Sequence, residues 1–432
     1  MKPQLLIGGL NSGSGKTTFT MGFLRVLRKQ GLQVQPYKCG PDYIDTQFHS
    51  LATGHQSVNL DTWLASEEHV KHIYAKYGKN ADACITEGVM GVFDGYSRMK
   101  GSSAEIAMLL DIPVVLVVNA RSTAYTVASQ IYGVKQFCPQ MKLAGVVFNQ
   151  VSSPNHYVFL KDACMDAGVE CFGYLPKFEG LEIPSRHLGL TLGVKEQMNE
   201  QIEMSAGLVE EFVDVGRILE RCSCELKESP CLKAKKQAGL LKIAVAMDEA
   251  FNFVYRENIE RLKQMGSVTF FSPLKGEALP EANLIYLPGG YPELFASRLQ
   301  KHRRLMNGLR KYAENGGKML AECGGMMYLT RVLNGKRNRR YSFCGVLPLE
   351  CTMENARLHL GYREVVDMRG NHWRGHEFHY SDVVGTEALP SVARQYNAQG
   401  KEVNTPLYRY KNVIAGYTHL YWGETDILKL WE

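Results

Sequence analysis

The segment LLIGGLNSGSGKTTFTMGFLRVLRKQG, at residues 5–31, constrains the fold more than any other part of the chain. A short apolar run precedes a turn of glycine and serine, and an amphipathic run follows it. This order predicts a buried strand, a loop and a helix. A glycine-rich loop at the start of a helix directs backbone N–H groups toward phosphate oxygens. We therefore predict a nucleotide site formed by Gly13, Gly15, Lys16, Thr17 and Thr18.

The GKT triplet of this loop has a specific chemistry. Lys16 is expected to reach the terminal phosphates, and Thr17 to place its hydroxyl on Mg²⁺. The standard pattern has a glycine five residues before its last glycine, a position that Leu10 occupies here. Gly9 lies six residues before Gly15, so the loop is one residue longer than the standard pattern. The alternative is a Ser/Gly turn that contains GKT by chance, and the context of strand, loop and helix argues against it.

Further polar residues follow other predicted strands of the first half. Lys38, Asp42 and Asp45 lie in YKCGPDYID, and Glu87 ends ACITE. Because open parallel sheets bind ligands at the carboxyl ends of their strands, these side chains suit a site for Mg²⁺, phosphate and an acid. Solvated turns and a surface carboxylate remain the alternatives. Asn149, which ends LAGVVFN, is a weaker candidate for contact with adenine.

The wider pattern predicts an α/β protein with a doubly wound parallel sheet in its first half. Apolar runs such as ACITEG and IPVVLVVN alternate with helical segments such as SSAEIAMLL, and Gly31 suits the end of the first helix. The chain of 432 residues is long enough for two or three domains. The polar segment 225–240 is the best linker, which gives domains 1–224 and 241–432. A second α/β alternation follows the linker and ends in strand-like aromatic segments.

Composition excludes several classes of protein. The net charge of +6 comes without a long Lys/Arg run, so nucleic acid is not expected as a partner, whereas small polyanions are. No apolar run approaches the length of a membrane span. Eleven cysteines without regular spacing or a secretion signal favour reduced thiols in a cytoplasm.

The second half carries a candidate nucleophile. Cys323 follows an apolar run and precedes two glycines in AECGGMMYL, as in a sharp turn from strand to helix, where a helix N-terminus can lower a thiol pKa. Gly289 and Gly290 in LPGGYPE can supply oxyanion N–H groups, and His419 in GYTHLYW is the candidate base. A buried, inert cysteine is the alternative.

The segment RGHEFHYS supplies His376, Glu377 and His379, but it lacks the HExxH spacing of a zinc site. It predicts either a strand with alternating side chains or a role near the active site, and both readings stay open.

These segments together resemble a known family. SGSGKTT, YKCGPDYID, NLDTWL, EGVMGVFDG, IAVAMDEAFNFVY, LPGGYPEL, AECGGMMYL, LHLGYRE, RGHEFHYS and GYTHLYW occur in the order typical of the cobyrinate a,c-diamide synthase family. The resemblance covers nearly the whole chain. It implies a dethiobiotin-synthetase-like P-loop domain followed by a class I glutamine amidotransferase domain.

The resemblance implies an ATP- and glutamine-dependent ligase that amidates the a and c carboxylates of cobyrinic acid. ATP, L-glutamine and a tetrapyrrole would be its partners, and Mg²⁺ its cofactor. By the motif match, Cys323 is the nucleophile and His419 activates it, while Asp45 and Glu87 hold metal and Asp42 and Asp45 face the substrate. Gly15, Lys16 and Thr17 hold the nucleotide, Lys38 lies near the transferred phosphate, and Asn149 reads adenine.

One departure concerns the acid of the amidotransferase triad. Many class I amidotransferases continue the histidine with Pro-Glu, whereas Leu420 and Tyr421 follow His419 here. A dyad, or an orienting group from elsewhere in the chain, is therefore implied.

Related chemistries remain open alternatives. Nickel-sirohydrochlorin and hydrogenobyrinic acid are rival substrates, and a homodimer is an open alternative to a monomer. Cobyric acid synthase shares the architecture but amidates four other positions. A partitioning or regulatory P-loop ATPase is disfavoured, because GGLNSG lacks the extra lysine typical of that class and because Cys323 and His419 would have no role.

Overall fold

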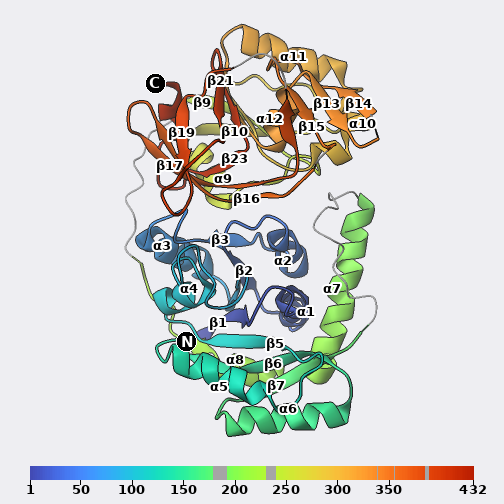
Figure 1. Ribbon diagram of the computed structural model, residues 1–432, viewed down its shortest axis with the longest axis vertical. Helices are drawn as coiled ribbons and strands as arrows, with labels where there is room; N and C mark the ends of the chain where they lie inside the picture. Colours follow the sequence, from blue (N-terminus) through green and yellow to red (C-terminus); the bar gives the residue numbers. More distant parts are fainter. Residues whose placement is uncertain (179–191, 230–239, 338, 355, 385–388) are drawn as a thin grey trace. The chain divides into compact units, whose positions relative to one another are not determined.

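The computed structural model describes residues 1–178, 192–229, 240–337, 339–354, 356–384 and 389–432 (Figure 1). The described residues form two compact units, one on each side of the gap at 230–239. Most of the predicted linker at 225–240 lies outside the described residues, so its bounds remain a prediction. Within the described part of the chain, no helix has both the length and the apolar character that crossing a bilayer requires.

The first unit contains the predicted parallel sheet. Its elements are β1 (Lys2–Gly9), α1 (Lys16–Lys29), β2 (Val34–Cys39), α2 (Asp45–Thr53), β3 (Val58–Leu60), α3 (Glu67–Gly78), β4 (Ala83–Glu87), α4 (Ser103–Leu110), β5 (Val114–Asn119), α5 (Val127–Phe137), β6 (Leu143–Val151), α6 (Pro154–Asp166), β7 (Cys171–Pro176), α7 (Leu192–Phe212), α8 (Val215–Arg221) and β8 (Ser223–Cys224).

The strand order is β3-β2-β4-β1-β5-β6-β7, and all neighbours in this order are parallel. The short strand β8 pairs antiparallel with β1. Helices α1, α2 and α7 lie on one side of the sheet, and α3, α4 and α5 on the other (Figure 1). The doubly wound α/β fold predicted from the sequence is thereby confirmed.

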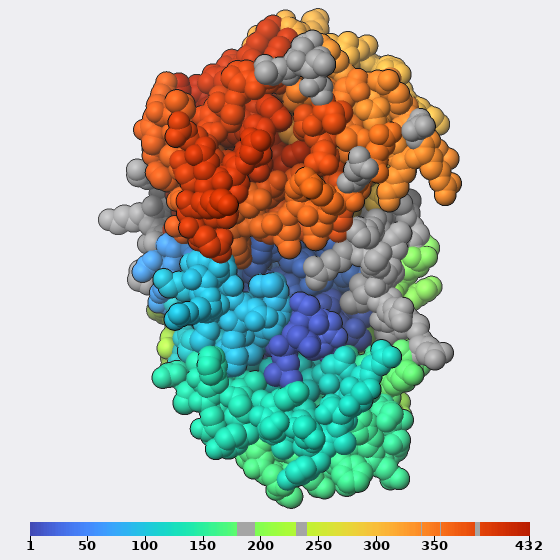
Figure 2. All heavy atoms as spheres, in the orientation of Figure 1, coloured from blue at the N-terminus to red at the C-terminus, as the bar shows by residue number. Residues whose placement is uncertain are grey.

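The order of the strands determines where the first unit can bind ligands. Strand β1 lies between β4 and β5, and β4 lies between β1 and β2. The loops that follow β1, β2 and β4 therefore meet at the carboxyl edge of adjacent strands. In Figure 2, dark blue atoms of the first part of the chain reach the surface among cyan and teal atoms. The phosphate loop exposes Asn11, Ser12 and Gly13.

The second unit combines a parallel sheet with antiparallel additions. Its elements are β9 (Leu241–Ala246), α9 (Arg256–Met265), β10 (Gly266–Phe271), β11 (Leu284–Leu287), η1 (Pro292–Leu294), α10 (Ala296–Leu299), α11 (Arg303–Glu314), β12 (Lys318–Glu322), α12 (Gly324–Leu329), β13 (Val332–Gly335), β14 (Arg339–Ser342), β15 (Glu350–Thr352), β16 (His359–Asp367), β17 (His372–His379), β18 (Asp382–Val384), β19 (Ala393–Tyr396), β20 (Glu402–Val403), β21 (Leu407–Tyr410), β22 (Val413–Gly416), β23 (Thr418–Tyr421) and η2 (Ile427–Trp431).

The main sheet of the second unit has the order β10-β9-β11-β12-β22-β21, with only β21 antiparallel to its neighbour. A five-stranded antiparallel sheet has the order β20-β19-β16-β17-β23, and a four-stranded sheet the order β14-β13-β15-β18. The two late strands β22 and β23 thus belong to different sheets, and only Tyr417 separates them. This bend positions His419, the second residue of β23.

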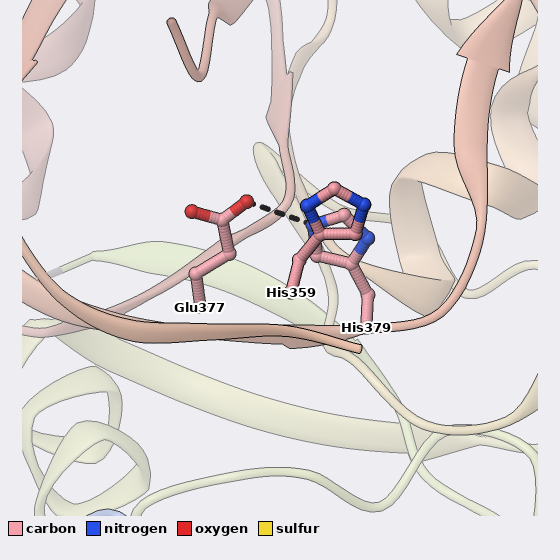
Figure 3. A group of neighbouring side chains, drawn as sticks. All are labelled: His359, Glu377 and His379. Carbon is pink, nitrogen blue, oxygen red and sulfur yellow. Dashed lines mark hydrogen bonds and ion pairs between the residues drawn. The ribbon is translucent and has the colours of Figure 1, made fainter. Parts of the chain in front are cut away.

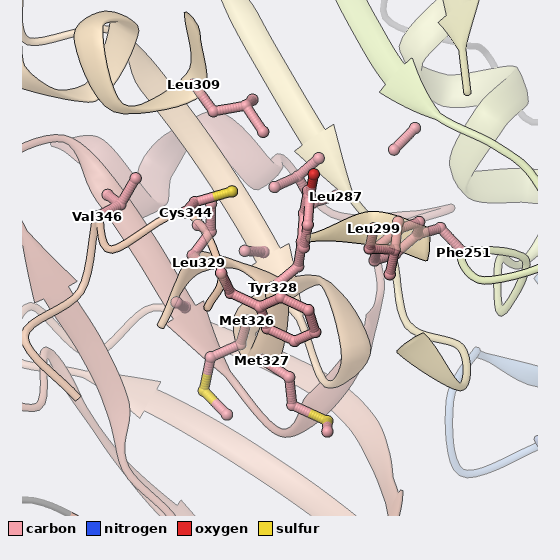
Figure 4. Close-up of a cluster of buried hydrophobic side chains, with 14 of the residues drawn as sticks. Phe251, Leu287, Leu299, Leu309, Met326, Met327, Tyr328, Leu329, Cys344 and Val346 are labelled. Atoms are coloured by element: carbon pink, nitrogen blue, oxygen red, sulfur yellow. The ribbon is translucent and has the colours of Figure 1, made fainter. Parts of the chain in front are cut away.

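Helix α12 is buried from its first residue to its last. Its side chains belong to one apolar cluster with Leu287 of β11, Leu299 of α10 and Leu309 of α11 (Figure 4). The helix contributes Met326, Met327, Tyr328 and Leu329 to this cluster. Burial of a leucine-sized side chain contributes about 1.5–3 kcal/mol relative to exposure. The turn that precedes α12 is therefore anchored to the core of the unit.

Candidate active sites

The phosphate loop connects β1 to α1 through two glycines with left-handed backbone. Gly13 has φ 78° and Gly15 has φ 96°, a region that favours glycine. A Cβ atom on Gly15 would also lie 1.9 Å from Asn149 Nδ2, so a side chain cannot fit there. Lys16 is buried, and its Nζ donates to the carbonyl oxygens of Asn11 at 3.0 Å and Met90 at 2.6 Å. The lysine predicted to bind phosphate therefore donates to a carbonyl of its own loop and to one of the loop that follows β4.

Asn149 supports the phosphate loop from the end of β6. Its Nδ2 donates to the carbonyl oxygen of Ser14 at 3.1 Å, and its side chain is buried. Thr18 lies in the first turn of α1, where its carbonyl oxygen accepts a bond from Ser205 Oγ at 2.5 Å. Contact of Asn149 with adenine remains a prediction, while its contact with the loop is a second role that the sequence did not reveal.

A buried cluster of charges lies beside this loop. Lys38 on β2 is in register with Glu87 on the neighbouring β4. Lys38 Nζ lies 2.8 Å from Glu87 Oε1 and 2.7 Å from Asp45 Oδ2. Thr17 Oγ1 donates to Glu87 Oε1 at 2.8 Å and lies 3.5 Å from Asp45 Oδ2. Four predicted residues from three sequence segments are therefore brought together in one site.

The protonation states follow from burial and charge. Burial alone would raise the pKa of Glu87, but Lys38 and His49 outweigh it and hold that pKa well below its usual range. Burial and the neighbouring Asp42 raise the pKa of Asp45 to about 6, against the opposing effect of Lys38. Burial alone would lower the pKa of Lys38, but Asp45 and Glu87 raise it above its ordinary value. The cluster thus retains an ammonium group against at least one carboxylate.

Asp42 holds the turn that leads into α2. Its Oδ1 accepts the backbone N–H groups of Ile44 at 2.8 Å and Asp45 at 2.9 Å. These bonds are typical of an aspartate at the start of a helix, and they leave its other oxygen outside this turn. Contact of Asp42 with substrate remains a prediction.

His49 is a member of the cluster that sequence reasoning missed. Its Nε2 lies 2.7 Å from Glu87 Oε2, its Nδ1 lies 3.3 Å from Ser57 Oγ, and its ring is fully buried. The only available signal was its spacing, because His49 stands four residues after Asp45 and so lies on the same face of α2. It engages the second oxygen of Glu87 and fixes the direction of that carboxylate.

The donor set of this cluster fits a magnesium ion. Thr17 offers a hydroxyl, and Asp45 and Glu87 offer carboxylate oxygens, the hard ligands that Mg²⁺ prefers. The two carboxylates already contact the positive charge of Lys38 Nζ. The site therefore suits a cation near a nucleotide, which remains a proposal.

The second site is built on the turn from β12 to α12. Cys323 has φ 46° and ψ −108°, a conformation that residues with side chains rarely adopt. Its backbone N–H donates to the carbonyl oxygen of Gly416 at 2.7 Å, which attaches the turn to β22. The Sγ–H group donates to the carbonyl oxygen of Phe378 at 3.7 Å. The sharp turn matches the expectation for AECGG, and the thiol is buried.

Closely packed glycines join the predicted oxyanion loop to this turn. A Cβ atom on Gly289 would lie 2.1 Å from His419 Cε1, so the imidazole packs directly on that glycine. A Cβ atom on Gly324 would lie 2.8 Å from the carbonyl oxygen of Gly290. The glycine loop therefore contacts both His419 and the residue after Cys323.

Burial keeps both groups neutral. It raises the pKa of the Cys323 thiol well above the ordinary value, and the neighbouring Glu293 adds to the rise. Burial and the nearby His376 and His379 lower the pKa of His419 to about 3. The expectation that a helix N-terminus lowers this thiol pKa is not met, because α12 has only six residues and burial dominates.

Two buried side chains, in addition to the neighbouring strand β17, hold the backbone after His419. Glu322 Oε1 accepts the N–H of Leu420 at 3.0 Å, and Asn258 Nδ2 donates to the carbonyl oxygen of Leu420 at 2.8 Å. Glu322 Oε2 also accepts the hydroxyl of Tyr286 at 2.7 Å. Burial raises the pKa of Glu322 to about 8. An acid from β12 therefore holds the strand that carries His419.

The RGHEFHYS segment forms β17 and contributes a second acid–histidine pair. Glu377 Oε1 lies 2.8 Å from His379 Nε2, and Glu377 Oε2 accepts a bond from Arg363 Nε at 2.5 Å. Burial alone would raise the pKa of Glu377, but His379 and Arg363 lower it to about 2. In the strand pairing, His376 lies opposite His419. This strand therefore borders the cysteine site.

Glu377, His379 and His359 offer ligand atoms within 4.8 Å of one another (Figure 3). The rings of His359 and His379 are stacked, however, with centroids 4.7 Å apart and an interplanar angle of 5°. A metal ion bound by two imidazoles must lie in the plane of each ring, which parallel stacked rings do not allow. Because Arg363 also occupies the carboxylate, we assign no metal to this trio.

Two family models match the chain. Residues 5–190 match the CobQ/CobB/MinD/ParA nucleotide binding domain, and residues 242–427 match the CobB/CobQ-like glutamine amidotransferase domain. The first match contains the phosphate loop and the buried charge cluster. The second contains Cys323, His419 and the glycine loop.

Curated relatives align over nearly the whole length. A cobyrinate a,c-diamide synthase from Caldanaerobacter subterraneus subsp. tengcongensis is 40% identical, covering 96% of this chain and 94% of its own. Those from Priestia megaterium and Saccharolobus solfataricus are 37% and 36% identical and cover 99% and 98% of this chain, and 96% and 99% of their own.

Proposed function

This chain belongs to the cobyrinate a,c-diamide synthase family, and we propose that it converts the a and c side-chain carboxylates of cobyrinic acid into amides. It is a glutamine-dependent ligase of cobalamin biosynthesis that uses ATP as co-substrate. The proposal extends this description to the two carboxylates, the macrocycle, Mg²⁺ and the intermediates.

One observation carries the proposal: a single chain holds both a phosphate loop with a buried lysine–carboxylate cluster and a cysteine–histidine site on a glycine loop. The first arrangement suits phosphoryl transfer, and the second suits attack on an amide. An enzyme that needs only ATP hydrolysis has no use for the second site.

The first unit has the groups needed to activate a carboxylate. A carboxylate is a poor electrophile, and transfer of a phosphoryl group converts it into an acyl phosphate with a good leaving group. That transfer depends on positioning and on neutralised charge. Lys16 and Lys38 supply fixed positive charge. Thr17, Asp45 and Glu87 would hold Mg²⁺, which would supply further charge to neutralise phosphate. His49 keeps Glu87 aimed at this site.

The second unit has the groups needed to release ammonia from glutamine. We infer that Cys323 Sγ attacks the side-chain amide carbon while its proton passes to His419, which then protonates the departing ammonia. Backbone N–H groups at Gly289 and Gly290 would stabilise the oxyanion. Water then hydrolyses the γ-glutamyl thioester and restores the thiol. Ammonia made in this way displaces phosphate from the acyl phosphate and forms the amide.

The choice of cobyrinic acid rests on the full-length relatives. Nickel-sirohydrochlorin and hydrogenobyrinic acid present similar acetate side chains, and the same two sites could amidate them. The identity of the macrocycle is therefore the part of the proposal that most needs a direct test.

An isotope experiment tests the acyl phosphate. Cobyrinic acid labelled with ¹⁸O in its carboxylates is incubated with ATP, Mg²⁺ and glutamine, and the released phosphate is analysed by mass spectrometry. An acyl phosphate transfers one ¹⁸O atom to phosphate for each amide formed. Amide formation with unlabelled phosphate would contradict the proposed intermediate.

A second measurement separates this ligase from a regulatory P-loop ATPase. ATP hydrolysis is followed with and without glutamine and cobyrinic acid. The ligase requires turnover that increases with both and matches amide formed. Hydrolysis that is indifferent to both compounds would favour the ATPase.

A further inference from the structure

A carboxylate with one unpartnered oxygen among the described residues lies beside the cysteine site. Glu293 is the second residue of the 3₁₀ turn η1, which begins three residues after Gly289. Its Oε2 is enclosed and has no hydrogen-bond partner among the described residues. Ion pairs and hydrogen bonds normally accompany an enclosed carboxylate, because removal from water without them is costly. The turn therefore holds an acceptor that lacks a donor.

The packing of η1 places this acceptor next to Cys323. A Cβ atom on Gly324 would lie 2.7 Å from Pro292 Cδ, so the residue before Glu293 touches the residue after the nucleophile. Among charged groups, Glu293 has the largest effect on the pKa of the Cys323 thiol, and it also raises the pKa of the Cys351 thiol. Burial raises the pKa of Glu293 to about 7. The empty acceptor and the nucleophile thus belong to one site.

The proposed substrate of this site carries a matching donor. L-glutamine has an α-ammonium group, and three carbon–carbon bonds separate its Cα from the amide carbon that Cys323 would attack. We propose that Glu293 receives the α-ammonium group of glutamine and so selects an α-amino acid as nitrogen donor. This inference rests on the proposed glutaminase reaction and names the substrate group that one of its residues recognises. A charge-assisted bond of this kind would also satisfy the enclosed oxygen.

The test compares glutamine with glutaramate, the analogue that lacks the α-amino group. Ammonia release is measured for wild type and for Glu293→Gln, which keeps the shape of the side chain and removes its charge. We expect KM for glutamine to rise roughly 10- to 100-fold in the variant, as loss of a bond to a charged group implies, with a much smaller change in kcat. The kcat/KM for glutaramate should change little, so that preference for glutamine over glutaramate falls.

Control measurements separate the possible failures. Glu281→Gln removes an exposed carboxylate of the same unit, and it should change neither the KM for glutamine nor the KM for glutaramate. Urea unfolding followed by the fluorescence of Trp373, Trp422 and Trp431 verifies that the second unit of Glu293→Gln is folded. An unchanged KM for glutamine, or equal losses with glutamine and glutaramate, would overturn the role of Glu293. Absence of ammonia release from glutamine by the wild type, with ammonium-driven amidation intact, would instead overturn the proposed glutaminase reaction.

Discussion

At the scale of single residues, the cysteine site is at rest in a neutral state. A thiol attacks as thiolate, yet burial raises the pKa of Cys323 and lowers the pKa of His419 to about 3. The thiol keeps its proton and donates to the backbone carbonyl of Phe378, rather than forming a thiolate–imidazolium pair with His419. Proton transfer to His419 therefore has to accompany attack on the substrate, which limits side reactions of a free nucleophile.

Alkylation by iodoacetamide tests this resting state. Because the pKa of Cys323 is raised, its rate should increase about tenfold per pH unit from pH 5 to 9 without a plateau. Cys171 is an internal comparison, because a bond from Cys164 lowers its pKa, so it should react at lower pH. Peptide mass spectrometry resolves the two thiols. A plateau for Cys323 between pH 5 and 8 would reveal a preformed ion pair and contradict the neutral state.

Two substitutions separate the two chemistries. Cys323→Ala should lower glutamine-dependent amidation by a factor of about ten thousand or more, as loss of a nucleophile does, and leave ammonium-dependent amidation in place. Lys16→Ala should remove amidation with either donor, because phosphoryl transfer precedes both. Amide formation is measured with each donor for each variant. Retained amidation by Lys16→Ala would contradict the role of the phosphate loop.

At the scale of elements, the turn from β12 to α12 packs directly on the loop that contains Gly289 and Gly290. Gly289→Ala would place a methyl group into the His419 ring, whose Cε1 lies 2.1 Å from the Cβ position. A displacement of about 1 Å costs roughly 100-fold in rate, so glutaminase activity should fall at least that far while ammonium-dependent amidation persists.

Gly308→Ala is the matched control for this change. Gly308 lies in α11, where a Cβ atom would meet Leu279 only at 3.8 Å. This substitution should leave glutaminase activity unchanged. Equal activity of the two alanine variants would contradict the packing of His419 on Gly289.

The bonds from Glu322 and Asn258 to Leu420, here called the clamp on β23, predict a pH dependence of stability. The pKa of Glu322 is raised to about 8, so its neutral form stabilises the fold below about pH 4.5, and this contribution is lost as pH rises toward 8. Glu322→Gln keeps an acceptor for Leu420 but cannot ionise. Wild type should therefore lose stability relative to this variant between pH 5 and 8.5.

Unfolding in urea, followed by tryptophan fluorescence, measures this difference. Trp373, Trp422 and Trp431 lie in the second unit, so the signal reports mainly on that unit. A difference between wild type and Glu322→Gln that does not vary with pH would show that Glu322 does not titrate in this range.

The elements predicted from the sequence are those with a local signal. Buried parallel strands such as IPVVLVV are continuous apolar runs, and AECGG announces a sharp turn through its glycines. The short strands β3 and β8 carry no such signal, because pairing with neighbours defines them. The clamp by Glu322 and Asn258 joins residues far apart in the chain, and no periodicity reveals it. His49 was missed for a similar reason, since a lone histidine on a helix gives no ligand signature.

At the scale of the whole molecule, each of the two units carries a separate half of one reaction. The parallel sheet of the first unit brings Thr17, Lys38, Asp45 and Glu87 together from two strands and two helices at its carboxyl edge, where such sheets bind ligands. The second unit supplies the nitrogen. Neither unit alone accounts for glutamine-dependent amidation, which is why the central prediction concerns the product rather than either partial reaction.

Product analysis with three alternative macrocycles, each incubated separately, tests that prediction most directly. The chain is incubated with ATP, Mg²⁺ and glutamine and with cobyrinic acid, hydrogenobyrinic acid or nickel-sirohydrochlorin in parallel, and products are followed by mass spectrometry. We expect a diamide from cobyrinic acid at the highest kcat/KM. A clear preference for another macrocycle would contradict the assignment of cobyrinic acid, and absence of amide from all three would contradict the proposed function.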